Sequence, residues 1–193
     1  MVHETLTTLD SQSVLAQART FFEANFKPVR IKPHSRFDGF FTGWIVENNV
    51  VITDHWHGIS FYGMRDSRIV NNSVIDLAEG QPGPPWIMVT DHKNGTPSDN
   101  VIVRNNLAAD FELSGNNITD DHNIEFGDAS ALFVAPPLDL HLLAGAAAVD
   151  AGSADLAPNV DIEGRPRPQG AGYDIGAYER AVDAIFADGF ENR

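Results

Sequence analysis

A short phrase, Ile-Val followed by paired asparagines, recurs at residues 45–49, 69–72 and 102–106. Its second asparagine returns after 23 residues (49 to 72) and then after 34 (72 to 106). Repeats of roughly 20 to 50 residues are typical of solenoids, in which each repeat stacks on its neighbour to bury a shared core. Apolar residues within each copy alternate with a period of two, which argues against helical repeats. The repeat therefore predicts an all-β chain, built as a β-solenoid.

Paired asparagines suit a tight corner between strands for two reasons. Asparagine tolerates the left-handed backbone region, and stacked asparagine amides can hydrogen-bond to one another along a column. Counting from the aligned asparagine, Thr53, Asp76 and Asp110 each lie four residues further on. We therefore expect these three residues to form one column, with the asparagines stacked in another.

A second alignment concerns the strands that follow the corner. Residues 59–61 (Ile-Ser-Phe) and 87–89 (Ile-Met-Val) match in pattern, and we expect them to lie side by side. Arg65 and Lys93 each follow the first isoleucine of their segment by six residues. The same register predicts these two cations on adjacent turns of the coil, about 5 Å apart.

The 193 residues fit one domain, which we divide into four predicted parts. Residues 1–28 hold a capping helix, because apolar residues recur at helical spacing in 10–26 and an open solenoid edge needs a cover. Residues 29–126 carry the turns of the coil. An irregular closing segment, rich in Ala, Leu and Pro, occupies 127–180, and a mobile tail follows at 181–193.

The charge of the chain is acidic and unevenly distributed, with a formal net value of −14. Residues 1–104 contain nine Lys and Arg against eleven Asp and Glu, or −2, whereas residues 105–193 contain four against sixteen, or −12. This balance argues against nucleic acid and against an anionic membrane as partners. An acidic half of this kind can also collect calcium, which is the one cofactor that we predict.

Other features of the composition narrow the class further. Cysteine is absent, so neither a disulfide nor a thiol nucleophile can be proposed. No stretch approaches the ~20 apolar residues that cross a bilayer, so we expect no membrane insertion. Residues 1–5 lack the basic and apolar regions of a signal peptide. We therefore expect either that an export signal has been removed or that the chain is a piece of a longer protein.

The second half of the chain resembles a known class of protein. The motif Asp-x-x-Gly-x-x-Arg-Pro at 161–168, followed by Asp-Ile-Gly-Ala-Tyr-Glu at 174–179, resembles the C-terminal closing segment of bacterial right-handed parallel β-helix proteins. Residues 145–152 match the stretch that precedes it in such proteins. The repeats at 57–63 and 67–72 are similar to turns of the pectate-lyase-like superfamily. The residues that carry the resemblance span about 44–180.

This resemblance implies a short right-handed parallel β-helix that acts on polysaccharide in a secreted or periplasmic location, by lyase, epimerase or hydrolase chemistry. Residues 185–191 also resemble a terminal signature of exported proteobacterial proteins. Family members usually stack many more turns than the three clear ones seen here and a weaker fourth at 116–126. The chain is thus expected to be either a small enzyme or the C-terminal part of a larger one.

Two polar clusters carry the candidate chemistry, at residues 54–57 and 91–93. Cleavage of a uronate polymer by β-elimination needs a cation for the carboxylate, a base for the C5 proton and an acid for the leaving oxygen. We assign Arg65 and Lys93 to carboxylate binding and His55 or His57 to the base. The predicted substrate-binding residues are Trp56, Trp86, His92 and Arg104, and the predicted calcium ligands are Asp54, Asp76, Asp91 and Asp110.

Each assignment has a structural alternative. His55 and His57 point the same way from a strand and Trp56 the opposite way, which is also an ordinary structural pattern. A His-x-His pair can bind a transition metal, but spacing fixes no third ligand. Residues 91–93 also read as a polar turn, and Asp76 and Asp110 as hydrogen-bonding turn residues.

These patterns leave two leading functions open. One is binding and cleavage of a uronate-containing polysaccharide outside the cytoplasm, on the face that contains residues 54–65 and 91–93. The other is a non-catalytic module, the last turns and closing cap of a larger secreted protein. Three or four turns give only ~15–20 Å of axis, which is short for a polymer cleft and favours the module. Self-association through the solenoid ends is a third expectation.

Overall fold

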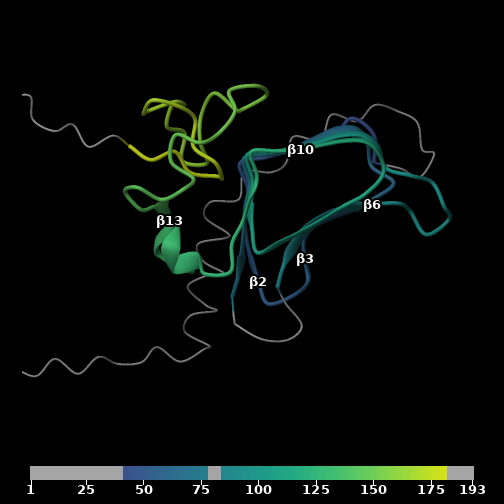
Figure 1. Cartoon of the computed structure of the whole chain (residues 1–193), viewed down its shortest axis with the longest axis horizontal. Helices are drawn as coiled ribbons and strands as arrows, with labels where there is room; N and C mark the ends of the chain where they lie inside the picture. Colours follow the sequence, from purple (N-terminus) through teal and green to yellow (C-terminus); the bar gives the residue numbers. More distant parts are fainter. Residues whose placement is uncertain (1–40, 78–83, 182–193) are drawn as a thin grey trace, which may run out of the picture. The chain divides into compact units, whose positions relative to one another are not determined.

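The computed structural model describes residues 41–77 and 84–181, which form an all-β structure with mainly parallel sheets (Figure 1). The first sheet contains β1 (Ile45–Glu47), β4 (Arg65–Val70), β7 (Asp99–Arg104) and β10 (Asn116–Asp121). The second contains β2 (Val50–Thr53), β5 (Ser73–Asp76), β8 (Leu107–Ala108) and β11 (Ile124–Glu125). The third contains β3 (His57–Tyr62), β6 (Trp86–Thr90) and β9 (Asp110–Leu113).

The chain visits the three sheets in the same order on each of three passes, and a fourth pass adds β10 to the first sheet and β11 to the second. β1, β2 and β3 belong to the first, second and third sheets, and β4 returns to the first sheet beside β1. Each strand pairs in parallel with its equivalents from the neighbouring passes. The predicted all-β class and the parallel pairing are therefore confirmed. The predicted capping helix at 10–26 and the tail beyond residue 181 lie outside the described residues.

The predicted stacking of asparagine amides is confirmed. The Nδ2 group of Asn49 donates to Oδ1 of Asn72 at 2.8 Å, Asn72 to Asn106 at 2.9 Å, and Asn106 to Asn123 at 2.9 Å. Each accepting Oδ1 also receives the backbone N–H of the preceding asparagine, at 2.9–3.0 Å. Asn72 and Asn106 are completely buried. The ladder thus satisfies buried polar groups and fixes the first-to-second-sheet corner of every pass.

The residue before each ladder asparagine has the left-handed backbone that we predicted for this corner. Its φ is 54° at Asn48, 52° at Asn71 and 56° at Asn105. On the fourth pass the same place is taken by His122, with a φ of 51°. Because asparagine adopts this conformation at lower cost than most residues, the paired asparagines serve the turn and the ladder together.

The strand register is confirmed in part. Ile59 pairs with Ile87, and Phe61 with Val89, as expected, and Thr53 pairs with Asp76. The prediction that Arg65 lies beside Lys93 is wrong, because Arg65 pairs with Asp99. The chain between β6 and β7 is longer than that between β3 and β4, and it forms a turn in which the His92 N–H donates to the Thr96 carbonyl at 2.8 Å. This insertion shifts the register of the first sheet relative to the third.

The predicted column of Thr53, Asp76 and Asp110 is also wrong in its third member. Only Ala109 separates β8 from β9. The third pass therefore turns directly into the third sheet, where Asp110 pairs with Trp86. The segments between the sheets differ in length from one pass to the next. Counting residues from the aligned asparagine therefore does not give the correct strand partners beyond the second sheet.

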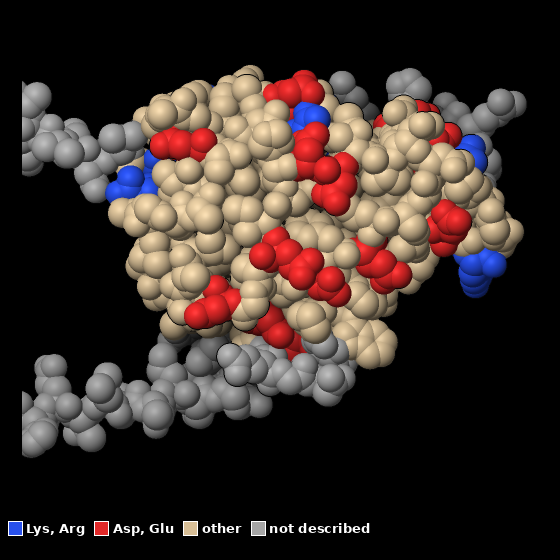
Figure 2. Space-filling view, viewed as in Figure 1, with Lys and Arg blue, Asp and Glu red and all other residues tan. Residues whose placement is uncertain are grey.

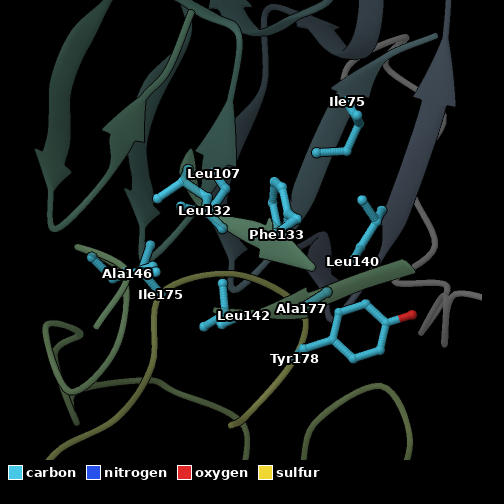
Figure 3. Close-up of a cluster of buried hydrophobic side chains, with 11 residues drawn as sticks. Ile75, Leu107, Leu132, Phe133, Leu140, Leu142, Ala146, Ile175, Ala177 and Tyr178 are labelled. Carbon is cyan, nitrogen blue, oxygen red and sulfur yellow. The ribbon is translucent and has the colours of Figure 1, made fainter. Parts of the chain in front are cut away.

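Residues 127–180, the predicted closing segment, contain little regular structure. They hold a short 3-10 helix, η1 (Ala129–Ala131), and an antiparallel pair, β12 (Phe133–Ala135) and β13 (Asp139–Leu142). Side chains of this segment pack on the second sheet around the fully buried Phe133 (Figure 3). A second cluster lies between the three sheets. The first cluster contains Ile75, Leu107, Leu132, Phe133, Leu140, Leu142, Ala146, Ala148, Ile175, Ala177 and Tyr178.

The closing segment is also bound by the first asparagine of each pair. The Nδ2 groups of Asn48, Asn71 and Asn105 donate to the carbonyls of Val160, Asp174 and Ser153, at 2.7, 3.1 and 2.8 Å respectively. The second asparagine therefore joins the passes to one another, while the first joins them to the closing segment. Figure 1 shows this segment, in green and yellow, beside the corner.

A buried polar network lies within the closing segment. Arg167 and Glu179 form an ion pair at 2.8 Å, and both side chains are fully buried. Arg167 also donates to the Gly176 carbonyl at 2.9 Å, and Glu179 accepts the Gln169 N–H at 2.9 Å. Burial raises the pKa of Glu179, and the backbone donors and Arg167 oppose that rise. Arg167 and Glu179 belong to the two motifs on which the family resemblance rests, so the motifs have a structural role here.

His141 of β13 links two carboxylates. Its Nδ1 lies 2.6 Å from an Asp139 oxygen and its Nε2 lies 3.1 Å from a Glu163 oxygen. Burial acts to lower the pKa of His141, but the hydrogen bonds to Asp139 and Glu163 outweigh burial and raise it. Burial raises the pKa of the neighbouring Tyr178 to about 12.

The raised pKa of His141 predicts a stability that falls as the pH rises. Its contribution is fully present below the ordinary histidine pKa of about 6.5, and it is lost as the pH increases through the raised folded-state pKa. We expect the urea midpoint of wild type to lie above that of His141→Asn. The difference between the two midpoints should be larger at about pH 5.5 than at about pH 8.5. A difference between the two proteins that stays constant over this range would contradict the proposed role.

The end of the third pass and the whole fourth pass are acidic. Residues 110–128 contain six Asp and Glu and no Lys or Arg. Figure 2 shows acidic side chains spread over one face with few basic ones between them. Charged side chains at a sheet edge oppose pairing with another chain. The charge therefore works against the predicted self-association, which remains a prediction. The six are Asp110, Glu112, Asp120, Asp121, Glu125 and Asp128.

Candidate functional site

The outward face of the third sheet gathers most of the predicted aromatic and histidine residues. Alternate residues of its strands point inward and pack in the core between the sheets, and they are Ile59, Phe61, Ile87, Val89, Phe111 and Leu113. Since successive side chains of a strand point to opposite faces, the residues between them point outward. The outward set is Ser60 and Tyr62 of β3, Trp86, Met88 and Thr90 of β6, and Asp110 and Glu112 of β9. Within this set Met88 is buried, with only 3% of its surface exposed.

An aromatic corner lies where the chain enters this sheet, and we define it as His55, Trp56, His57 and Trp86. The rings of Trp56 and Trp86 are 6.2 Å apart between centroids, and those of His57 and Trp86 are 5.4 Å apart. The His55 and His57 rings stack at 5.3 Å. The Trp56 side chain is 44% exposed. The sequence prediction that these four residues share a site is consistent with this arrangement.

The Trp86 ring is held in place by hydrogen bonds. Its indole N–H lies 3.1 Å from Ser60 Oγ and 3.3 Å from His57 Nδ1, and these two acceptors are themselves 2.9 Å apart. Gly58 allows the strand irregularity beside them, because a Cβ there would lie 2.3 Å from Val74 Cγ1. The sheet therefore presents Trp86 in a fixed orientation next to the exposed Trp56.

The hydrogen bonds set the tautomers of the two histidines. An indole N–H can only donate, so His57 Nδ1 accepts, and His55 Nδ1 accepts the His57 backbone N–H at 3.2 Å. Each neutral ring then carries its proton on Nε2. An Nε2–H group donates a hydrogen bond to a hydroxyl, but it has no lone pair with which to remove a proton. The arrangement favours binding of a hydroxyl-rich ligand over the predicted role as a base.

The predicted cations lie elsewhere. Arg65 belongs to the first sheet, beside Asp99. Lys93 follows β6 in the inserted turn, at the opposite end of the third sheet from Trp56. Arg104 also lies in the first sheet and forms ion pairs with Asp121 and Asp155. The hydrogen bond to Asp121 raises the pKa of Arg104 against the effect of its burial. The structure does not bring these three cations together at the aromatic corner.

The remaining predicted residues are dispersed. Asp91 and His92 open the inserted turn, as the polar-turn alternative predicted, and Asp54 is exposed at the start of the aromatic corner. Asp76 ends β5 beside Thr53, away from the register position of Asp110. Within residues 41–77 and 84–181, no group of three or more His, Asp and Glu side chains is arranged to hold a metal ion. Calcium binding stays a prediction.

Three residues of this face were not predicted as site residues. Ser60 orients Trp86, Tyr62 is 42% exposed at the far end of β3, and Glu112 lies on β9 in register with Met88. The alternation of polar and apolar residues in 57–62 was the signal that could have identified Ser60 and Tyr62. For Glu112 the signal was the alternation of polar and apolar residues in 110–113. The assumed register placed Asp110 in the column of Thr53 and Asp76, on another sheet.

Comparisons of this chain with protein-family models, with curated proteins and with solved structures each returned no match. In the part of the chain that the structure describes, no helix is long and apolar enough to cross a membrane.

Proposed function

We propose that this chain is a short right-handed parallel β-helix that binds polysaccharide outside the cytoplasm, through the aromatic corner and the outward face of the third sheet. The observation that carries the proposal is the exposed Trp56 beside the fixed ring of Trp86. The ordered return of the chain to three parallel sheets supports the β-helix. The resemblance of its closing motifs supports the class and the location.

Tryptophan side chains suit sugars because the indole and the sugar each combine an apolar face with polar groups at the edge. The face of a tryptophan packs against the apolar C–H face of a pyranose, while polar groups around it bind the hydroxyls. Here the Nε2–H groups of His55 and His57 supply donors, and Ser60 and Thr90 add hydroxyl groups. From His57 to Tyr62 the face extends over six residues, whose five residue steps span roughly 16 Å. That length accommodates a few sugar units.

The same geometry favours binding without cleavage. Uronate β-elimination needs a cation and a base at one sugar unit. Residues 54–62, β6 and β9 contain no Lys or Arg, and the histidine lone pairs are engaged within the protein. A non-catalytic carbohydrate-binding module needs neither a cation nor a base at the site. It therefore accounts for these observations better than a lyase does.

Replacing Trp56 by alanine is expected to weaken polysaccharide binding about tenfold, or ~1.4 kcal/mol, because it removes half of the stacking surface. Calorimetry against a panel of polysaccharides identifies the one that binds wild type and then measures its affinity for the variant. Leu138→Ala is the matched control, since Leu138 is 51% exposed and belongs to the closing segment. Equal affinities of Trp56→Ala and wild type would contradict the placement of the site.

A second proposed function is that of a terminal module that closes a β-helix. The observation in its favour is the closing segment itself, in which the fully buried Arg167–Glu179 pair organises a loop that covers the second sheet. The two proposals are compatible, because one uses the third sheet and the other uses the corner between the first and second. An unfolding experiment on Arg167→Met tests the second.

A further inference from the structure

We propose that the outward face of the third sheet takes an uncharged glycan rather than a uronate polymer. This inference rests on the proposed binding function and specifies its ligand. β9 carries the carboxylates of Asp110 and Glu112, and Asp54 is exposed two residues before Trp56, while residues 54–62, β6 and β9 contain no Lys or Arg. These segments together have a formal charge of −3, with the histidines neutral.

The carboxylates lie next to the aromatic corner. Asp110 is the direct strand partner of Trp86, and Glu112 is the partner of Met88, which in turn pairs with Ser60. Neighbouring strands are about 4.8 Å apart, so a ligand stacked on Trp86 lies close to both carboxylates. Asp110 accepts the Phe111 N–H at 2.8 Å, and Glu112 is exposed.

The cations of the described residues do not offset this charge. Arg68 pairs with Glu47 and Arg104 with Asp121 on the first sheet, and Arg104 also pairs with Asp155 of the closing segment. Arg65 begins a strand of that same sheet. Lys93 follows the far end of β6, and the four residue steps from Trp86 to Thr90 alone span roughly 13 Å. A negative ligand at Trp86 therefore lies beside the carboxylates of Asp110 and Glu112, and within the described residues no Lys or Arg is a strand neighbour of Trp86.

Ligand chemistry follows from this arrangement. A uronate polymer carries one carboxylate on each sugar, which the face repels at low ionic strength. The hydroxyls of an uncharged sugar instead donate to Asp110 and Glu112, and such charge-assisted hydrogen bonds are the stronger kind. Nε2–H groups of the two histidines then donate to the same hydroxyl network. Acceptors, donors and stacking rings all match a ligand without acidic groups.

The test compares two classes of polymer on the whole chain at about 20 mM and about 150 mM salt. Polygalacturonate and alginate represent the uronates, and xylan, glucomannan and galactan represent the uncharged glycans. We expect the best uncharged glycan to bind at least ~10-fold more tightly than either uronate at low salt, and the gap to narrow as salt increases.

A charge variant sharpens the test. Asp110→Asn with Glu112→Gln keeps an acceptor oxygen at each place and removes two charges. The ratio of polygalacturonate affinity to uncharged-glycan affinity should rise about tenfold at low salt. The matched control, Asp120→Asn with Glu125→Gln, removes two charges from the first and second sheets, and it should leave that ratio within about twofold.

Each other outcome overturns the inference in a distinguishable way. If polygalacturonate binds wild type more tightly than every uncharged glycan, with or without added calcium, the ligand class is wrong while the binding function stands. If the control pair changes the ratio as much as the Asp110 and Glu112 pair does, the charge selectivity does not come from this face. If no polymer of either class binds the folded chain, the binding function itself fails.

Discussion

Replacing Arg167 by methionine should destabilise the folded chain by about 3–5 kcal/mol. Arg167 and Glu179 are both fully buried and lie 2.8 Å apart. Removing the guanidinium leaves a buried carboxyl without its charge partner, and it also removes the donor to the Gly176 carbonyl. Such a loss is a large fraction of the stability of an ordinary domain. Urea unfolding, followed by circular dichroism, measures it.

Arg165 supplies a matched control two positions earlier in the chain. It also pairs with a glutamate, Glu163 at 2.9 Å, but both side chains are more than a third exposed. Exposed pairs contribute little, so Arg165→Met should cost less than about 1 kcal/mol. Adding Glu179→Gln to Arg167→Met should restore part of the lost stability, because it removes the stranded charge. Equal effects of the two arginine variants would show that the buried pair does not hold the closing segment together.

Replacing Asn106 by alanine should cost about 3–4 kcal/mol, since several buried hydrogen bonds disappear together. Oδ1 of Asn106 accepts both the side-chain and the backbone N–H of the buried Asn72. Its Nδ2 donates to Asn123 and to two backbone carbonyls. The substitution leaves donors of Asn72 buried without an acceptor. Thermal unfolding of the variant, compared with wild type, gives the size of the effect.

The position of each asparagine predicts a gradient. Asn123 ends the ladder and is only partly buried, so Asn123→Ala should destabilise less than Asn106→Ala does. Asn116→Ala changes an exposed side chain of β10 outside the ladder and should stay within about 0.5 kcal/mol of wild type. If Asn116→Ala costs as much as Asn106→Ala, the ladder is not what stabilises the corner.

The fold could be predicted from the sequence wherever one residue type repeats for one physical reason. Paired asparagines at Asn49, Asn72 and Asn106 predicted the corner, the amide ladder and the strand class together. Counting residues from the aligned asparagine gave the wrong strand partners where the segments between the sheets differ in length. The inserted turn after β6 and the single residue Ala109 before β9 move Arg65 and Asp110 to other partners. Loop length is not periodic, and the sequence pattern does not encode it.

The candidate site was predictable to a similar extent. His55, Trp56 and His57 are close together in the chain, and Trp86 joins them through the alignment of 59–61 with 87–89, which is confirmed. The prediction placed Arg65 beside Lys93 without allowing for the insertion after β6. Neither cation therefore lies at the site. Nothing local distinguishes the buried Arg167 from the exposed Arg165, because burial depends on which loop covers each side chain.

The most direct test of the proposed function is a calorimetric titration of the whole chain with the best uncharged glycan from the panel. We predict heats that saturate at a fixed stoichiometry, return to baseline after each injection and give an affinity about tenfold lower in Trp56→Ala. Such a titration indicates binding at the aromatic corner without turnover. Heat that continues after each injection would show cleavage of the polymer and contradict the non-catalytic account. Saturating heats that persist unchanged in Trp56→Ala would place the site elsewhere on the chain.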